Sequence, residues 1–422
     1  MRYADFWTKL LIRTGIARFL PTVQRLTDGG GAYLHYYSDQ VLTAPLTELR
    51  ELAAYQGLQG PDTIDLTWGA PRFDLVSSGS TKLPADRRGW PSSWGLPELR
   101  DAVAEKLLAD HSLDVNPADE VLVTHGAAGA FSLALDTFVN RGDRVVLFDP
   151  TSPLYILSLR HRRARIRWLS TWMDNGRTRF RLDALAQALS GARMLILTSP
   201  GNPTGGVIAA EDLEQIAWWA ERKDVLIYSD GVFAPYQYDG VPASIGPLAK
   251  ARRRTLTVGS VSKQYALASL RVGWLAGYRH LVRPCALMAV MRSPFVPTLC
   301  QQVAVTALRQ SDEAFRTIRT TFESRRRYAF ERLQALGLEP DWPAGAFSLW
   351  VPVRTLGIGG RRFAEQLLHT KKVLVSPGSL FGPSGSGHIR LSYATEDGRL
   401  REGLSRLTDF VGGLRVPMRH AA

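Results

Sequence analysis

The feature that most constrains the fold of this chain is a series of short runs in which nearly every residue is apolar or β-branched. These runs occupy residues 121–124, 144–148, 194–198, 225–228 and 255–259. Segments with helical character lie before and between them, at residues 97–110, 127–140 and 213–223. A strand that is apolar at every position is buried on both faces, as happens when helices cover both sides of a parallel sheet. The pattern therefore predicts an α/β fold with a mostly parallel sheet between helices.

The pattern changes after about residue 300. One long helical pattern covers residues 301–336, and strands are expected at 348–353 and 389–393, with a helix from Arg362 between them. This order predicts a smaller α+β domain. We expect three parts: an N-terminal arm at 1–64, which joins the small domain or a dimer contact, a large domain at 65–300, and a small C-terminal domain at 301–422. A length of 422 residues is sufficient for two domains.

The N-terminal arm contains an amphipathic segment, residues 5–13, followed by a break at Gly29, Gly30 and Gly31. The segment is interrupted by charge and is too short to span a membrane. We interpret it as a helix packed across a dimer, and a helix lying on a membrane surface is the alternative.

The chain carries a formal net charge of +13. Its basic clusters, at residues 160–165, 252–254 and 325–327, are short and scattered, and no nucleic-acid motif accompanies them. We therefore expect a solvated basic surface and no nucleic-acid partner. The two cysteines, Cys285 and Cys300, match no disulfide or metal-binding spacing, so we expect no metal site and a cytoplasmic location.

Lys263 is the residue whose neighbours most clearly indicate chemistry. It follows Ser260 and Ser262, and Arg271 and Gly273 come soon after it. A lysine with the ordinary pKa of about 10.4 is a poor nucleophile at neutral pH. A nearby cation and apolar neighbours lower that pKa. This setting suits a lysine that forms a Schiff base with an aldehyde such as that of pyridoxal phosphate.

Asp230 follows the apolar run at 225–228, so it lies at the carboxyl end of an expected buried strand. Open α/β sheets bind their ligands at that end of the strands. A carboxylate there can pair with the pyridine nitrogen of pyridoxal phosphate and keep the ring protonated.

A candidate phosphate site lies where the strand at 121–124 leads into a helix. Gly126, Ala127 and Ala128 open this helix, whose end provides unpaired N–H groups and a partial positive charge. Further donors for a phosphate are expected from Ser260, Ser262 and Arg271.

These motifs together resemble those of the fold-type I, class I/II aminotransferases, which depend on pyridoxal phosphate. The resemblance covers about residues 65–412 and includes Gly201-Asn202-Pro203-Thr204-Gly205 and Pro377-Gly378-Ser379-Leu380-Phe381-Gly382. It implies a large domain with a mostly parallel seven-stranded sheet and a smaller α+β domain.

The resemblance also implies roles for residues that their spacing alone does not identify. Asn202 would donate a hydrogen bond to the phenolic oxygen of the cofactor ring, and Arg390 would bind the α-carboxylate of the substrate in a bidentate fork. Gly69 would belong to the loop that closes over that carboxylate.

At three positions this chain departs from the aromatic residues that are usual in the family. Phe233 replaces a tyrosine and can stack but cannot donate a hydrogen bond. Ser152 replaces the aromatic that stacks on the ring, for which Tyr155 or His125 would substitute. Trp90 replaces the residue that reaches the phosphate of a neighbouring subunit, which implies a homodimer, although Trp90 could equally belong to the core of an interface.

The function implied is an aminotransferase that moves the amino group of an L-α-amino acid to a 2-oxo acid by a ping-pong mechanism through a Lys263 Schiff base. The alternative is a lyase, cyclase or oxidase that acts through the same quinonoid intermediate. A third reading, a non-enzymatic regulator, is disfavoured by the joint presence of the expected site residues. The sequence does not identify the amino acid or the oxo acid.

Overall fold

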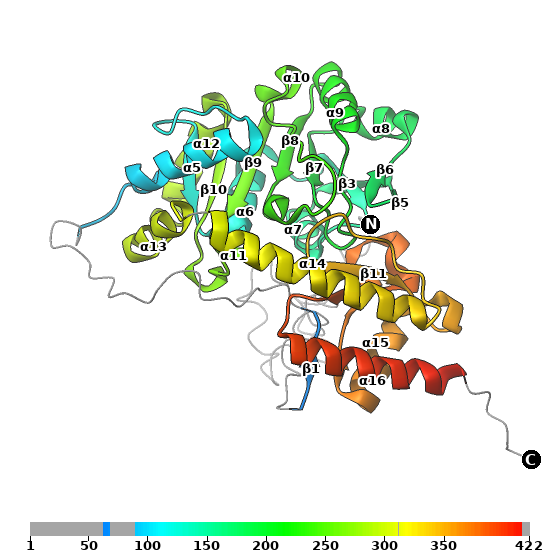
Figure 1. Ribbon diagram of the computed structural model, residues 1–422. Coiled ribbons are helices and arrows are strands. Elements are labelled where there is room, and N and C mark those ends of the chain that lie inside the picture. Colours follow the sequence, from blue (N-terminus) through cyan, green and yellow to red (C-terminus); the bar gives the residue numbers. More distant parts are fainter. Residues whose placement is uncertain (1–61, 68–88, 311, 416–422) are drawn as a thin grey trace, which may run out of the picture. The chain divides into compact units, whose positions relative to one another are not determined.

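The computed structural model describes residues 62–67, 89–310 and 312–415. The arm segment at 5–13, the glycine break at 29–31 and Gly69 lie outside these residues. Figure 1 shows the described helices and strands in chain order.

A seven-stranded sheet forms the centre of the first half of the described chain. Its strand order is β2-β10-β9-β8-β7-β3-β4. The strands are β2 (Val121–Thr124), β3 (Arg144–Asp149), β4 (Arg165–Ser170), β7 (Met194–Thr198), β8 (Leu226–Asp230), β9 (Thr255–Ser260) and β10 (Gly273–Gly277). All neighbouring pairs are parallel except the two that include β10. The predicted mostly parallel, seven-stranded sheet is confirmed.

Two strands of this sheet have compositions that do not indicate a strand. β10 has glycine at both ends, and glycine weakens a strand. It is tolerated because β10 passes closely over a helix terminus: a Cβ on Gly273 would lie 2.6 Å from the carbonyl carbon of Gly126. β4 includes Arg165 and Arg167 because it is an edge strand that is partly exposed to solvent.

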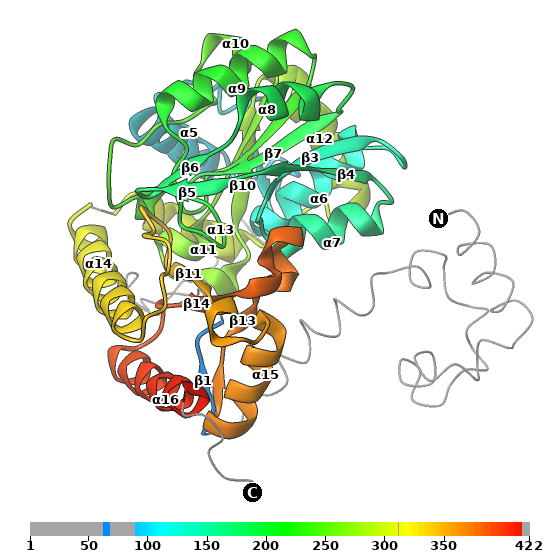
Figure 2. The ribbon, with the colours of Figure 1, turned by 90° about the vertical axis from the view of Figure 1, so that its right-hand side faces the viewer.

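Helices cover both faces of the sheet (Figure 2). One face packs against α6 (Gly126–Phe138), α7 (Pro153–His161) and α12 (Arg279–Arg292). The other packs mainly against α8 (Leu182–Leu189), α9 (Ala210–Arg222) and α10 (Ala249–Arg252). Along β3, Val145 and Leu147 belong to the first cluster and Val146 to the second. The apolar runs are therefore continuous because both faces of each strand are buried.

Further elements complete this half of the chain. α5 (Pro97–His111) and α13 (Thr298–Leu308) pack together beside β2 and β10. The remaining elements are the hairpin β5 (Trp172–Asp174) and β6 (Arg177–Arg179), the short helix α11 (Val261–Gln264), and the 3-10 helices η4 (Ala234–Tyr236) and η5 (Ala268–Leu270).

A second core joins the C-terminal half to the segment at 62–67. Its three-stranded antiparallel sheet has the order β11-β14-β13, and β1 pairs in parallel with β12. The strands are β1 (Ile64–Asp65), β11 (Ser348–Pro352), β12 (Val373–Leu374), β13 (Ser376–Pro377) and β14 (His388–Ser392). The helices are α14 (Asp312–Ala335), α15 (Gly360–Lys371), α16 (Asp397–Arg415), η6 (Arg354–Leu356), η7 (Gly378–Phe381) and η8 (Pro383–Gly387). The domain boundaries at 64 and 300 stay predictions.

The prediction of one long helical segment at 301–336 is wrong, because the structure has two helices there. α13 ends at Leu308, and α14 begins at Asp312. The sequence at this junction is Ser311-Asp312, and both residue types favour helix starts over helix interiors because their side chains compete for backbone hydrogen bonds. No helix within the described ranges is long and apolar enough to cross a membrane.

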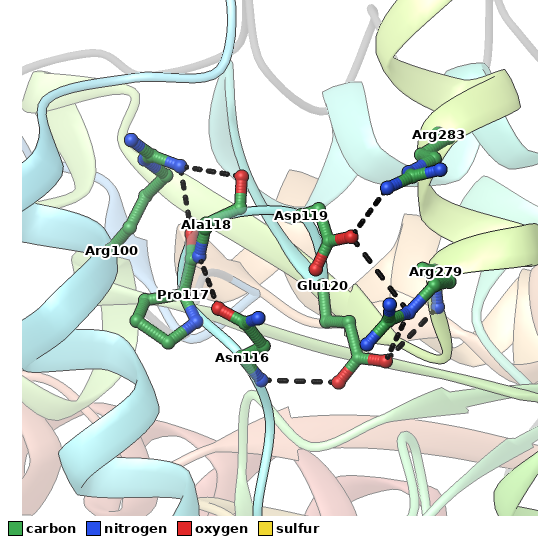
Figure 3. A network of polar contacts seen from close by, with 8 residues as sticks. All are labelled: Arg100, Asn116, Pro117, Ala118, Asp119, Glu120, Arg279 and Arg283. Atoms are coloured by element: carbon green, nitrogen blue, oxygen red, sulfur yellow. Dashed lines mark hydrogen bonds and ion pairs between the residues drawn. The ribbon is translucent and has the colours of Figure 1, made fainter.

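Buried Glu120 connects the start of β2 to two other segments (Figure 3). It accepts hydrogen bonds from the backbone N–H groups of Asn116, at 3.1 Å, and Arg279, at 3.3 Å. The side chain of Arg279 lies 3.6 Å from Glu120 and 3.8 Å from its neighbour Asp119, which also pairs with the side chain of Arg283 at 2.7 Å; both arginines are about half exposed. Glu120 therefore satisfies two backbone donors, while Asp119 contributes a surface ion pair.

We expect Glu120→Ala to lower the free energy of unfolding by about 2 kcal/mol, because two backbone donors lose their acceptor. Asp119→Ala is the matched control and should cost less than about 1 kcal/mol. Urea unfolding followed by circular dichroism measures both. Equal losses for the two variants would contradict this account.

Candidate active site

The site residues gather at one edge of the seven-stranded sheet. β2, β8 and β9 run in the same direction, and they end at Thr124, Asp230 and Ser260. β10 runs in the opposite direction and begins at this edge with Gly273, which pairs with both Thr124 and Ser260. The residues that follow these strand ends are therefore brought together, as is usual for ligand sites in α/β sheets.

Lys263 lies in the short helix α11, directly after β9. Ser260 caps this helix, because its Oγ accepts a hydrogen bond of 3.1 Å from the N–H of Ser262. Burial lowers the pKa of Lys263 to about 8, with smaller contributions in the same direction from Arg390 and Arg271, while Asp230 acts in the opposite direction. The expectation that this lysine has a lowered pKa therefore has a physical basis in the structure.

Two aromatic residues also contact Lys263. The hydroxyl of Tyr236 donates a 3.0 Å hydrogen bond to the carbonyl oxygen of Lys263. The ring centroid of Phe347 lies 5.8 Å from Lys263 Nζ. These contacts orient the lysine and help to keep water away from it.

Asp230 is buried at the end of β8. The N–H of Val232 donates to its Oδ1 at 3.0 Å, and the hydroxyl of Tyr155 donates to its Oδ2. Burial raises the pKa of Asp230, while these two hydrogen bonds and Lys263 lower it. The pKa of Tyr155 lies well above its ordinary value, chiefly because of burial, so this phenol stays protonated and remains a donor.

The predicted phosphate site is formed by the backbone of Gly126, the N-terminus of α6 and the guanidinium of Arg271. Gly126 starts α6 with a φ of +68°, and a Cβ on it would lie 2.6 Å from Nη2 of Arg271. Glycine is therefore needed both for the backbone conformation and for the space. The hydroxyls of Ser260, at the end of β9, and Ser262, on α11, lie 2.7 Å apart. The start of a 13-residue helix beside a guanidinium can bind an anion.

Arg390 extends from β14 toward the same edge. Its Nη1 donates to Oδ1 of Asn202 at 2.9 Å, and its Nη2 donates to the carbonyl oxygen of Thr67. Its Nε is buried and has no hydrogen-bond partner among the described residues. Burial lowers the pKa of Arg390 to about 10. The arrangement brings Asn202 and Arg390 together and leaves one buried donor for a ligand.

The remaining predicted residues take different places. The buried ring of Phe233 packs edge to face against Phe347, with centroids 5.2 Å apart. Ser152 is the residue that precedes α7. Trp90 is 87% exposed and contacts Phe295, with ring centroids 5.2 Å apart. Gly69 lies outside the part of the chain that the structure describes.

Sequence reasoning missed the contact that Tyr155 makes. The sequence predicts Tyr155 as a substitute for the aromatic that stacks on the cofactor ring; in the structure its hydroxyl donates to Asp230 and its ring packs against Phe131 in the core. His125, the other candidate, lies 2.8 Å from Ser293 Oγ through its Nε2. No local pattern signals the pairing of Tyr155 with Asp230, because 75 residues separate them.

Comparison with known proteins identifies the family. The model of the aminotransferase class I and II family matches residues 61–407. Aspartate aminotransferase of Pyrococcus abyssi is 32% identical over 87% of this chain and 96% of its own length. Aromatic-amino-acid aminotransferase 2 of Thermococcus litoralis is 31% identical over 88% of this chain and 97% of its own length.

A solved structure supports the same assignment. An aromatic aminotransferase from Pyrococcus horikoshii OT3 is 30% identical and aligns with a TM-score of 0.79 over 86% of this chain and 99% of that one. The family match covers both the seven-stranded sheet and the three-stranded sheet. The chain therefore belongs to the class I and II aminotransferases, and it is a fold-type I enzyme that uses pyridoxal phosphate to transfer amino groups.

Proposed function

We propose that this aminotransferase moves the amino group of an L-α-amino acid to a 2-oxo acid, with both half-reactions at the site around Lys263. The observation that carries the proposal is Arg390, whose buried Nε has no partner among the described residues while its Nη1 bonds to Asn202. The unpaired Nε–H offers a buried donor to a carboxylate, the group with which an arginine side chain forms charge-assisted hydrogen bonds. The α-carboxylate is the group that all α-amino acids and 2-oxo acids share.

The residues present fit pyridoxal phosphate. The N-terminus of α6, with the guanidinium of Arg271 packed against Gly126, suits the phosphate, with donors from Ala127, Ala128, Ser260 and Ser262. Lys263 would hold the aldehyde, Asp230 the pyridine nitrogen and Asn202 the phenolic oxygen. When bound, the cofactor supplies an electron-accepting ring for bond breaking at the α-carbon of the substrate.

The residues of the chain would then have separate tasks. Lys263, with a pKa of about 8, would take a proton from the α-carbon and later deliver it. Asp230 would be held in place by Tyr155 and Val232 and would keep the pyridine nitrogen protonated. Both half-reactions use the same residues, so ping-pong kinetics are expected.

The substrate class is supported by the relatives named above, which are an aspartate aminotransferase and an aromatic-amino-acid aminotransferase. Both kinds of amino acid carry the α-carboxylate that Arg390 would bind. A panel that contains L-aspartate and L-phenylalanine is therefore the appropriate first test of side-chain preference. Phe233 lacks the hydroxyl usual in the family, so Asn202 would hold the phenolic oxygen without its help.

We also propose a homodimer. Leu287, Val290 and Met291 are exposed on α12 at a spacing that places them on one helix face. Trp90, at 87% exposure, contacts Phe295 in the segment after α12, and Leu299 is exposed on α13. Contiguous exposed apolar side chains mark interaction sites. We propose that a second copy of the chain covers this surface, with Trp90 at the interface between the two subunits. We also propose a cytoplasmic location, where Cys285 and Cys300 would stay reduced.

We expect the cofactor-loaded enzyme, mixed with its amino acid substrate and no oxo acid, to form one equivalent each of pyridoxamine phosphate and 2-oxo acid and then stop. Single-turnover absorbance and product analysis measure both.

Lys263→Ala should lose covalent attachment of the cofactor and at least a thousandfold in rate, since both the nucleophile and the base are removed. Continued product formation with regeneration of the starting cofactor form would indicate a lyase, cyclase or oxidase.

The pH dependence of cofactor attachment should report the pKa of Lys263. Below about pH 8 the amine is protonated and unreactive, and above it the amine is neutral, so the rate at which cofactor-free enzyme attaches pyridoxal phosphate should rise through that pH. Arg390→Gln removes a cation that lowers this pKa, so the midpoint should move to higher pH. Arg181→Gln, which alters an exposed ion pair, is the control and should leave the midpoint unchanged.

Met291→Asp should convert the enzyme to a monomer, because a charge would be buried in the proposed interface. Analytical ultracentrifugation measures the change in mass. Val241→Asp places the same charge at another residue that is 87% exposed, and this control should stay dimeric. A wild-type monomer would contradict the proposed dimer.

A further inference from the structure

A buried carboxylate outside the predicted site joins two segments that are far apart in the chain. Asp149 ends β3 and is 5% exposed. The side chain of Ser384 donates to its Oδ1 at 2.8 Å, and the N–H of Ser384 lies 3.3 Å from Oδ1 and 3.2 Å from Oδ2. Asp149 therefore holds the start of η8 against the end of a central strand.

Two further features fix this junction. The N–H of Thr151 donates to the carbonyl oxygen of Phe381 at 2.7 Å. Gly382 has a φ of +131°, and a Cβ on it would lie 2.5 Å from Oδ1 of Asp149. The carboxylate thus sits directly against the backbone that carries Phe381, at a distance that glycine permits.

Phe381 connects this junction to Arg390, the arginine proposed to bind the substrate. Its ring is 1% exposed and lies 4.8 Å from Cζ of Arg390. The ring of Trp350 packs on it edge to face, with centroids 5.6 Å apart. A guanidinium is attracted to the face of an aromatic ring, so a shift of the Phe381 ring would also shift the Arg390 guanidinium.

We propose that Asp149 is a positioning residue for substrate binding: by holding Ser384 and Gly382 it fixes Phe381 against Arg390, and so orients the guanidinium for the α-carboxylate. The inference rests on the proposed role of Arg390. Asp149 acts as a hydrogen-bond acceptor in this role, and its charge is not required. A displacement of about 1 Å in a positioning contact is sufficient for a large loss of efficiency.

The test compares Asp149→Ala with Asp149→Asn in the full-length, cofactor-loaded enzyme, using the best amino acid of the panel. Asp149→Ala should raise KM about tenfold and change kcat less than about threefold, with cofactor affinity unchanged. Asp149→Asn keeps an oxygen that accepts from Ser384, so its KM should stay within about threefold of wild type. Equal losses in the two variants would show that the charge matters, and the inference would be wrong.

Ser384→Ala provides a second test if Asp149→Ala does not fold. It removes the 2.8 Å hydrogen bond and keeps the backbone N–H, so a KM about threefold higher is expected. Ser386→Ala is the matched control, since Ser386 is exposed on the same 3-10 helix. An unchanged KM in Ser384→Ala, or an equal rise in the control, would overturn the inference.

A double-mutant cycle with Arg390→Gln separates this inference from its premise. If Asp149 acts through Arg390, Asp149→Ala should raise KM less than about twofold in the Arg390→Gln background. A full tenfold rise in that background would show that Asp149 acts independently of Arg390, and the inference would fail alone. An Arg390→Gln enzyme with unchanged KM would contradict the proposed role of Arg390 itself, and the inference would fall with it.

Discussion

The removal of charged groups from water is the constraint on which the site depends. Lys263, Asp230 and Arg390 are ionisable, and burial is the largest influence on the pKa of each. Burial disfavours the charged form, so each group must be stabilised by hydrogen bonds or remain ready to change its protonation. For Lys263 the penalty of burying the charged form lowers its pKa, and this favours the reaction because the neutral amine is the form that reacts. For Arg390, burial of the charged guanidinium favours the binding of a carboxylate that neutralises it.

The neighbours of these groups follow from that constraint. Asp230 has donors from Tyr155 and Val232, and Arg390 donates to Asn202 and to the backbone of Thr67. Tyr155 lies in the first turn of α7, Val232 and Asn202 lie in the turns that follow β8 and β7, and Arg390 itself is the central residue of β14. A site built on the ends of packed strands keeps its geometry better than one built on loops alone. This explains why side chains from distant segments meet within hydrogen-bonding distance.

The apolar runs predicted the sheet well because burial on both faces leaves a signal in every residue. Five runs correspond to β2, β3, β7, β8 and β9 with small shifts at their ends. β4 and β10 gave no such signal, since an edge strand tolerates arginine and a strand beside a helix terminus needs glycine. The break between α13 and α14 was missed because its polar residues, which include Ser311 and Asp312, also occur on the exposed faces of helices and signal a helix start only weakly.

The sequence by itself determined the fold class and the chemical character of Lys263 and Asp230, because strand burial, helix termini and neighbouring residue types are local properties. Tertiary structure decided which partners these groups have. Tyr155 reaches Asp230 across 75 residues, Asn202 reaches Arg390 across 188, and Asp149 reaches Ser384 across 235. Such pairings depend on how strands are ordered in a sheet and on how the two cores pack. A single sequence carries no periodic signal for that order, because each contact occurs once and joins two residues that lie far apart along the chain.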